Sequence, residues 1–170
     1  MYNIAQTDFA AGHWNECMEQ IAQRLNSGDE QVQLVGLAIL KELVRAFMFE
    51  VDDPRKVLVG IAERFFGQLE GIMTTTIGRA DSPNQLKLMI GVAKIFQMCN
   101  ALQLLPFLME PGRLGNWVEF VVAILDSQQD NSSQLVQLTD DMHLIEQLDK
   151  SEWWKLKAIC SKISLKLYQK

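Results

Sequence analysis

The sequence predicts an all-α protein, and three observations support this fold class. Strand signals are nearly absent, since no run alternates apolar and polar residues and no Asn-Gly or Asp-Gly turn joins β-branched segments. Apolar residues recur instead at the three- and four-residue spacings of helices. The long helical segments also carry unusually broad apolar arcs, which indicates helices that are enclosed on more than one side.

The segment from residue 30 to about residue 49 shows the breadth of these arcs. Its apolar residues spread over more than half of the helix circumference: Val32, Val35, Ile39, Leu40, Leu43, Val44 and Phe47. We expect such a helix to be flanked on both sides as well as covered beneath, as in a stack of helix pairs. The sequence therefore predicts an α-α superhelix, a HEAT-repeat or armadillo-like solenoid of about three helix pairs. An irregular helical bundle is the alternative.

The first two pairs are expected over residues 9–49 and 55–102. A helix from Trp14 to Leu25 ends at Asn26-Ser27-Gly28, and Asp29 then caps the second helix, because its carboxylate can accept from the free amides of the first turn. Residues 50–54 are expected to break the chain before a helix over 56–75. After a loop at 78–82, Ser82-Pro83 is a good start signal for a helix that runs to about residue 101.

The third pair is expected over residues 114–170. Residues 104–111 are irregular around two prolines, and helices follow over 117–127 and 152–169. A polar, acidic loop at 128–151 separates them, with a short helical turn near 142–148. Trp14-x-Glu16 followed by Ile21 recurs as Trp117-x-Glu119 followed by Ile124. Pair starts separated by roughly 40 to 60 residues are near the spacing of HEAT repeats, so residues 1–170 are interpreted as a single HEAT-repeat segment.

The tandem tryptophan at positions 153 and 154 predicts how the last helix packs. Adjacent helical residues point about 100° apart, so Trp153 and Trp154 cannot contact the same neighbour. We expect Trp154 to turn toward an adjacent helix, while Trp153 lies on one face with Leu156, Cys160, Ile163 and Leu167. Both are interpreted as packing anchors.

Composition and charge restrict the class of protein. A hydrophobic content of 48% and a charged content of 22% are ordinary for a soluble domain. The net charge of −5 argues against nucleic acid or an anionic membrane as the main partner. Three widely spaced cysteines suit free thiols in a reducing compartment, and no signal peptide or membrane-spanning run is recognised. The expected compartment is the cytosol or nucleus.

Motifs of enzymes and cofactor sites were sought and not found. The sequence contains no phosphate-binding glycine loop, nucleophile elbow, zinc spacing or calcium loop. His13 and His143 stand alone and are interpreted as surface or capping residues. Gly67 and Gly71 form a GxxxG pattern, which we interpret as a site of close helix packing. The sequence therefore predicts neither an enzyme nor a metal or cofactor site.

Several motifs together resemble the importin-beta (karyopherin) family of nuclear transport receptors. Trp153-Trp154-Lys155-Leu156-Lys157, behind an acidic insertion, is similar to a motif of the importin-seven and importin-eight branch. Asn116-Trp117-Val118-Glu119 is similar to the tryptophan-initiated helix before that insertion. The run from Leu34 to Val44 resembles a second helix of these repeats, and Asp8-Phe9 followed by Trp14 resembles the start of an early repeat.

The resemblance implies a fold, partners and a location. The chain would be a fragment from the N-terminal half of a longer receptor, with apolar surface at its ends. Such receptors import protein cargo through nuclear pores under the control of the GTPase Ran in its GTP form, contact nucleoporins, and shuttle between cytoplasm and nucleus. Neither a cofactor, nor a nucleic acid, nor a membrane is expected as a partner.

The resemblance also implies where partners bind, because the second helix of each pair lines the concave face of such solenoids. The three second helices here carry basic residues, which we interpret as one partner-facing surface: Lys41, Arg45, Lys87, Lys94, Lys155, Lys162 and Lys166. The alternative is that these residues are only the solvated sides of three amphipathic helices. The acidic loop is a second candidate, for basic cargo such as ribosomal proteins or histones: Asp140, Asp141, Glu146 and Asp149.

A different function class fits the same periodicity. A HEAT-repeat scaffold or regulatory subunit, with no contact to Ran, would use the same helical array. The sequence features do not separate the two classes.

Overall fold

The computed structural model spans residues 1–170 and describes residues 14–77, 83–110, 112–127 and 152–168. Within these ranges 85% of the residues are helical and none lies in a strand. The predicted all-α class is confirmed for this part of the chain. The predicted loop at 78–82, the loop at 128–151 and His13 and His143 lie outside the described residues.

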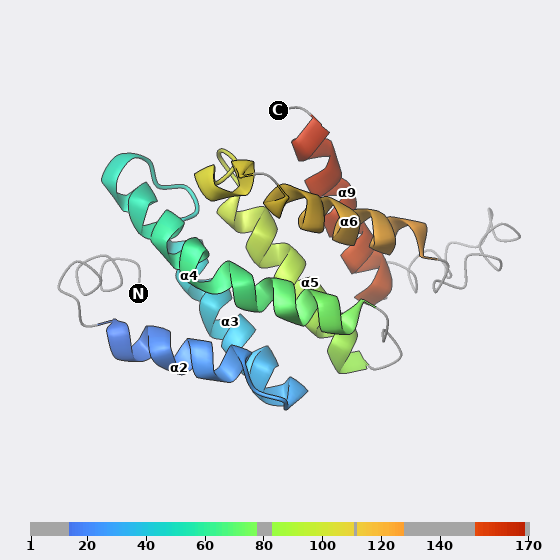
Figure 1. Ribbon diagram of the computed structural model, residues 1–170, viewed down its shortest axis with the longest axis horizontal. Helices are drawn as coiled ribbons and strands as arrows, with labels where there is room; N and C mark the ends of the chain where they lie inside the picture. Colours follow the sequence, from blue (N-terminus) through green and yellow to red (C-terminus); the bar gives the residue numbers. More distant parts are fainter. Residues whose placement is uncertain (1–13, 78–82, 111, 128–151, 169–170) are drawn as a thin grey trace, which may run out of the picture.

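The described residues form α-helices and one short 3-10 helix, η1, as labelled in Figure 1. In chain order the elements are α2 (Asn15–Leu25), α3 (Glu30–Phe47), α4 (Asp52–Thr76), α5 (Pro83–Cys99), η1 (Pro106–Met109), α6 (Arg113–Asp126) and α9 (Glu152–Tyr168). The Asp29 cap is confirmed, since the Gln31 amide donates to Asp29 Oδ1 at 2.8 Å. This bond satisfies one of the free amides at the start of α3.

Two helices begin earlier than the sequence predicts. α4 starts at Asp52, inside the expected break, and so contains Pro54 in its first turn. The first amides of a helix have no partner within it, so a proline there costs no helical hydrogen bond. α6 starts at Arg113 instead of Trp117, directly after Gly112, whose φ of 87° suits a residue without a side chain.

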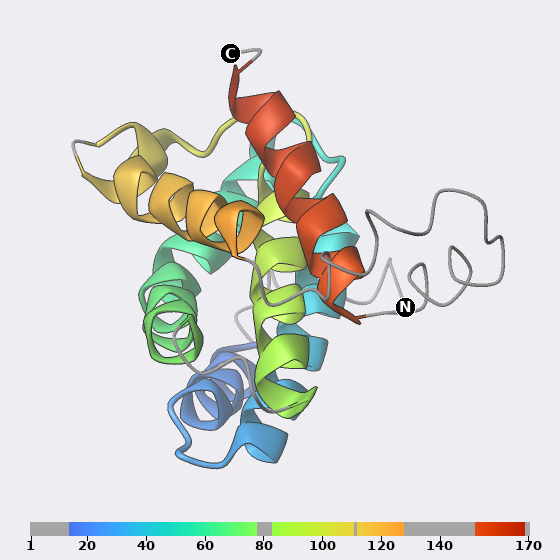
Figure 2. The same cartoon turned by 90° about the vertical axis from the view of Figure 1, so that its right-hand side faces the viewer.

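The helices lie in two layers. α2, α4 and α6 form layer A, in which α4 contacts both of the others; α3, α5 and α9 form layer B, in which α5 contacts both of the others. Across the layers, α2 packs on α3, α4 on α5 and α6 on α9. Figure 2 shows layer A (blue, green and gold) on one side of layer B (cyan, yellow-green and red).

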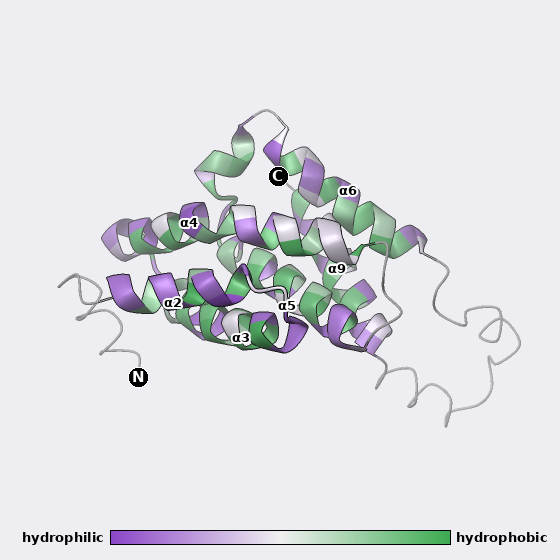
Figure 3. Cartoon of the chain, turned by 60° about the horizontal axis from the view of Figure 1, so that its bottom comes forward, coloured by the Kyte–Doolittle hydropathy of each residue, from purple (hydrophilic) through white to green (hydrophobic). Residues whose placement is uncertain are grey.

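The core lies between the layers, and α5 is its most enclosed helix. Of the 17 residues of α5, all of them described, only Pro83, Lys87 and Lys94 are exposed. The helices α3 and α9 flank α5 and α4 covers it from layer A. In Figure 3, α2 and α4 alternate between hydrophilic and hydrophobic residues, as expected for helices with one packed side and one exposed side.

The described helices flank α3 on one side, where the prediction expects neighbours on both. α5 covers one side of α3, but the opposite edge of its apolar arc is exposed: Val32 is 37%, Val35 51% and Ile39 37% accessible. These residues recur at i, i+3 and i+7, so they form one stripe along the helix. Among the described helices, α3 therefore has a neighbour on one side of its apolar arc and none on the other.

An aromatic cluster joins α4, α5, η1 and α6. The rings of Phe96 and Trp117 stack at 4.4 Å between centroids, and the rings of Phe66 and Phe107 meet edge to face at 5.1 Å. The Trp117 indole donates to Glu70 Oε1 at 3.0 Å. This bond supplies the polar partner that a buried indole requires. Trp117 is thus a packing anchor that links both layers.

Of the two adjacent tryptophans, Trp153 lies on the face of the helix that the sequence predicts. Trp153 is buried on the face of α9 that also carries Leu156, Cys160 and Ile163. Trp154 is half-buried on a different side of the helix. The two indoles therefore occupy different environments.

The interpretation of Gly67 and Gly71 as close-packing glycines is wrong. A Cβ atom placed on either residue would meet nothing within 4 Å. The close approaches are at Gly36, where a Cβ would lie 3.0 Å from Arg24 Cβ, and at Gly91, where it would lie 3.0 Å from Leu37 Cδ1. These glycines lie where α3 meets α2 and where α5 meets α3.

Candidate functional site

The two layers carry opposite charge. Layer B holds eight basic residues and three acidic ones: Lys41, Arg45, Lys87, Lys94, Lys155, Lys157, Lys162 and Lys166 against Glu30, Glu42 and Glu152. Layer A holds eight acidic residues and five basic ones: Glu16, Glu19, Asp52, Asp53, Glu63, Glu70, Glu119 and Asp126 against Arg24, Arg55, Lys56, Arg64 and Arg113. The side of layer B that faces away from layer A, its outer face, is therefore the candidate interaction surface.

The centre of this face is α5. Lys87 and Lys94 are separated by seven residues, so they lie on one side of the helix, opposite the residues that pack on layer A. The sequence of α5 contains no acidic residue. Neither lysine forms an ion pair with another described residue. No described residue therefore neutralises either ammonium group.

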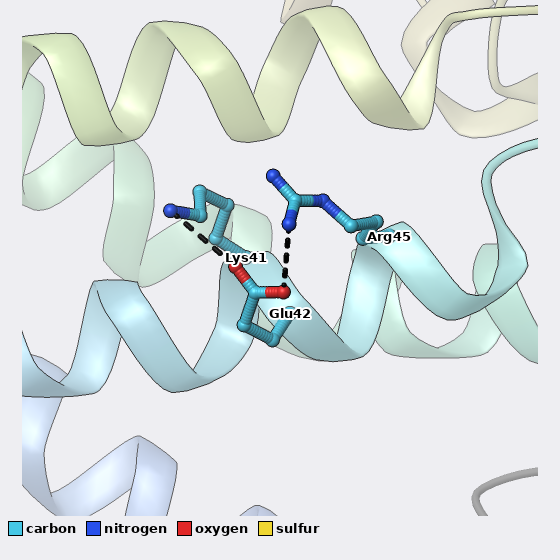
Figure 4. Close-up of polar contacts among 3 residues, drawn as sticks. All are labelled: Lys41, Glu42 and Arg45. Atoms are coloured by element: carbon cyan, nitrogen blue, oxygen red, sulfur yellow. Dashed lines mark hydrogen bonds and ion pairs between the residues drawn. The ribbon is translucent and has the colours of Figure 1, made fainter. Parts of the chain in front are cut away.

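The predicted basic stripe on α3 is a mixed cluster instead. Glu42 lies between the two cations and binds both, with Lys41 Nζ at 3.4 Å and Arg45 Nη1 at 3.0 Å (Figure 4). One carboxylate shared by two cations offsets part of their positive charge toward a partner. The α3 edge of the face is therefore less basic than the sequence predicts.

The α9 lysines divide into three roles. Lys162 is exposed and has no ion-pair partner among the described residues. Lys155 is also exposed, but its Nζ lies 3.5 Å from Glu152 Oε1. Lys166 turns toward α5 and donates to the carbonyl of Ala101, and burial lowers its pKa. Lys166 binds a carbonyl just beyond the end of α5 and so does not belong with the exposed residues of the face.

Arg55 is a structural cation that the sequence reading missed. It is 6% exposed, and its Nη2 donates to the carbonyls of Cys99 and Gln103, each at 3.0 Å. Burial lowers the pKa of Arg55. The first bond satisfies a free carbonyl at the end of α5, where a positive charge also complements the helix dipole, and the second binds the segment that follows the helix. The sequence held one indication of this role. An arginine in the first turn of a helix interacts unfavourably with that helix's dipole, which suggests that its charge is used by a different helix.

Other kinds of site find little support in the described residues. A cavity of about 10 Å³ between α5 and α9, lined by Phe96, Asn100, Ile163 and Lys166 among others, has room for one water molecule. Within the described ranges, no group of His, Cys, Asp and Glu is arranged to hold a metal ion. No helix in these ranges has the length and apolarity needed to cross a membrane. The predicted acidic site, Asp140, Asp141, Glu146 and Asp149, lies outside the described residues.

Comparisons with protein-family models, with curated proteins and with solved structures find no match to this chain. The resemblance to nuclear transport receptors therefore rests on the sequence motifs alone. The function has to be argued from those motifs and from the geometry of the two layers.

Proposed function

We propose that this chain is a segment of a HEAT-type α-α superhelix and that its layer B is a protein-binding surface of a nuclear transport receptor. The observation that carries the proposal is the packing order of the helices. First helices α2, α4 and α6 stack on one another, and second helices α3, α5 and α9 do the same. Stacked helix pairs that contact only their neighbours are the arrangement of solenoid proteins.

The exposed apolar residues at the two ends of the array support its continuation by further pairs. At one end α3 exposes Val32, Val35 and Ile39, and at the other end α6 exposes Val118 and Val122. Each set recurs at helical spacing on the side that carries no neighbour among the described helices. Apolar stripes of this kind are the surface on which another pair of a solenoid packs.

The transport role is supported by the motifs around Trp117 and Trp153-Trp154. The outer face of layer B also fits, because such a receptor needs a broad protein-binding surface. In this proposal layer B contacts Ran in its GTP form or protein cargo, and the protein moves between cytoplasm and nucleus. Nucleoporins would contact the complete receptor.

The test is a binding experiment with Ran loaded with GTP and, separately, with GDP. The polypeptide is used at its full natural length, because a single segment can lack part of the Ran footprint. We expect capture of the GTP form and at least about a tenfold preference over the GDP form, the factor that about 1.4 kcal/mol provides. Equal binding of both forms, or no binding of either, would overturn the transport proposal.

The rival is a HEAT-type scaffold or regulatory subunit without Ran contacts. It shares the stacked pairs and the basic face, since fold does not determine function. Stable co-purification with an enzyme or cytoskeletal assembly, together with no Ran binding, is the outcome that favours this rival.

A further inference from the structure

We infer that the outer face of layer B binds an acidic polypeptide segment through Lys87, Lys94 and Lys162. The inference rests on the proposed role of layer B as a protein-binding surface and names the chemistry of its partner. It starts from a difference in how the cations of this face are used. Among the described residues, some of these cations are paired or buried, and three are neither.

The paired and buried cations lie around the free ones. Lys41 and Arg45 share Glu42 on α3, and Lys155 lies beside Glu152 on α9. Lys166 is directed to the carbonyl of Ala101. These residues already have an anionic or polar partner within the chain, so they contribute less attraction to an external carboxylate.

Two of the three unpaired lysines lie on α5, at the centre of the face, and the third lies on the adjacent helix α9. Lys87 and Lys94 are the only charged residues of α5, and neither pairs with another described residue. Lys162 is exposed on α9, which packs directly against α5. On α9, Lys157 donates to the Ser127 carbonyl at the end of α6, whereas Lys162 lies about 140° further round the helix, away from α6 and layer A. The three ammonium groups therefore share one exposed side of two adjacent helices.

The stability of the fold does not explain these lysines. A solvated surface requires polar residues, but neutral or acidic ones would serve equally, and layer A carries a mixture of both signs. On α5 every exposed charge is positive. A surface of one sign attracts partners of the other sign and speeds their association.

The geometry favours a carboxylate-bearing polypeptide over a nucleic acid. Lys87 and Lys94 are two helical turns apart, about 10.5 Å along the axis, so an acidic helix with carboxylates at the same spacing would meet both. Nucleic-acid binding draws on many cationic contacts along the phosphate backbone, whereas three unpaired lysines among the described residues suit a short acidic segment.

The experiment measures binding of fluorescent probes to the full 170-residue chain. The probes are a glutamate-rich peptide, its glutamine counterpart and a single-stranded oligodeoxythymidine of the same charge as the glutamate peptide. The variant K87E/K94E reverses both charges at the centre of the face. The matched control K56E/R64E makes the same change in net charge on layer A, where both residues are exposed. A third variant, K162E, tests the contribution of α9.

The glutamate peptide should bind at low ionic strength, weaken as salt is added, and bind more tightly than the glutamine peptide. K87E/K94E should raise its Kd by about tenfold, K162E by about threefold, and the control by less than about twofold. Circular dichroism and urea unfolding of each variant establish that the fold is intact, since changes at exposed lysines cost little stability.

Three results would overturn the inference. One is no binding of the glutamate peptide at low salt, and another is an equal loss in K87E/K94E and in K56E/R64E, which would indicate a response to net charge alone. The third is tighter binding of the oligonucleotide with the same dependence on Lys87 and Lys94, which would make the face a phosphate-binding surface. Each differs from failure of the transport proposal, because Ran selectivity is measured separately and does not depend on the peptide.

Discussion

The neighbouring helices α3 and α5 differ in how much of their surface the rest of the protein covers. On α5, neighbours on both sides and layer A beneath leave only Pro83, Lys87 and Lys94 exposed. On α3, one edge of the apolar arc remains accessible along Val32, Val35 and Ile39. The width of an apolar arc reports how much surface a helix can bury. Its position in the array decides how much it does bury.

The most direct way to break this comparison is to make the same substitution in both helices. Ile95 of α5 is 1% exposed and Ile39 of α3 is 37% exposed. We expect Ile95→Ala to lower the free energy of unfolding by about 2–5 kcal/mol, because it leaves a cavity as well as losing buried area. Ile39→Ala should cost less than about 1 kcal/mol. Urea unfolding measures both, and similar costs would mean that a neighbour covers α3.

A second prediction concerns the cation that fixes the end of α5. Arg55→Met leaves the carbonyls of Cys99 and Gln103 without their donor, at a cost of about 2–3 kcal/mol. The matched control is Arg64→Met on the same helix, which removes an exposed pair with Glu19 and should change stability by less than about 1 kcal/mol. Thermal unfolding of the two variants gives the difference. Equal costs would show that α5 does not depend on this cap.

A third prediction tests how closely the covered side of α3 is packed, by comparing substitutions at two glycines. A Cβ at Gly36 would press on Arg24 Cβ at 3.0 Å and on the Leu25 backbone nitrogen at 3.3 Å, so Gly36→Ala should destabilise the protein by about 1 kcal/mol. Gly67 of α4 has open space around it, so Gly67→Ala should stabilise by about 0.5–1 kcal/mol through helix propensity. In chemical denaturation, a Gly36→Ala variant that is as stable as the unsubstituted protein or more stable would contradict the packing at Gly36, and a destabilised Gly67→Ala variant would contradict the open space at Gly67.

The last prediction concerns two buried thiols, whose effect on stability is absent at neutral pH and is expected only in alkaline solution. Burial raises the pKa of Cys99 on α5 and of Cys160 on α9 from 9.0 to about 12. Between about pH 9 and pH 12 the folded protein retains protons that the unfolded chain has lost, so the free energy of unfolding must fall as the pH rises. Below pH 9 both states are protonated at these thiols and stability is unaffected by them.

Urea unfolding at pH 8 and pH 10.5 checks this, with Cys160→Ala as the comparison. The variant should show a smaller fall between the two pH values than the unsubstituted protein. An unchanged fall would mean that Cys160 ionises in the folded state as it does in the unfolded chain.

Local signals in the sequence predicted most helices because their causes are local. Asp29 caps α3 as expected, since a carboxylate one residue before a helix can reach its first amides. Trp153 lies in the core with Leu156 and Cys160 because helical periodicity places them on one face. The starts of α4 and α6 were predicted too late. Pro54 lies in the first turn of α4 and Gly115 in the first turn of α6, and first turns tolerate both residues.

The candidate site was only partly predictable, because its composition depends on contacts between distant residues. The basic residues of the second helices were recognised from their positions on helical faces. The sequence did not reveal that Lys166 turns to the carbonyl of Ala101, or that Arg55 reaches Gln103, because these bonds join residues far apart in the chain. It also did not assign Glu42 to Lys41 and Arg45, although all three lie within one turn of α3.

The sequence by itself determined the all-helical class of the described part, the approximate helices and the face that each helix presents. Helical periodicity and capping act within a few residues, so they can be read along the chain. Only the tertiary structure decided that α5 is enclosed and α3 is not, and that Lys87, Lys94 and Lys162 remain unpaired among the described residues. Burial and ion pairing depend on which helices become neighbours, and helices alike in sequence pattern acquire different neighbours.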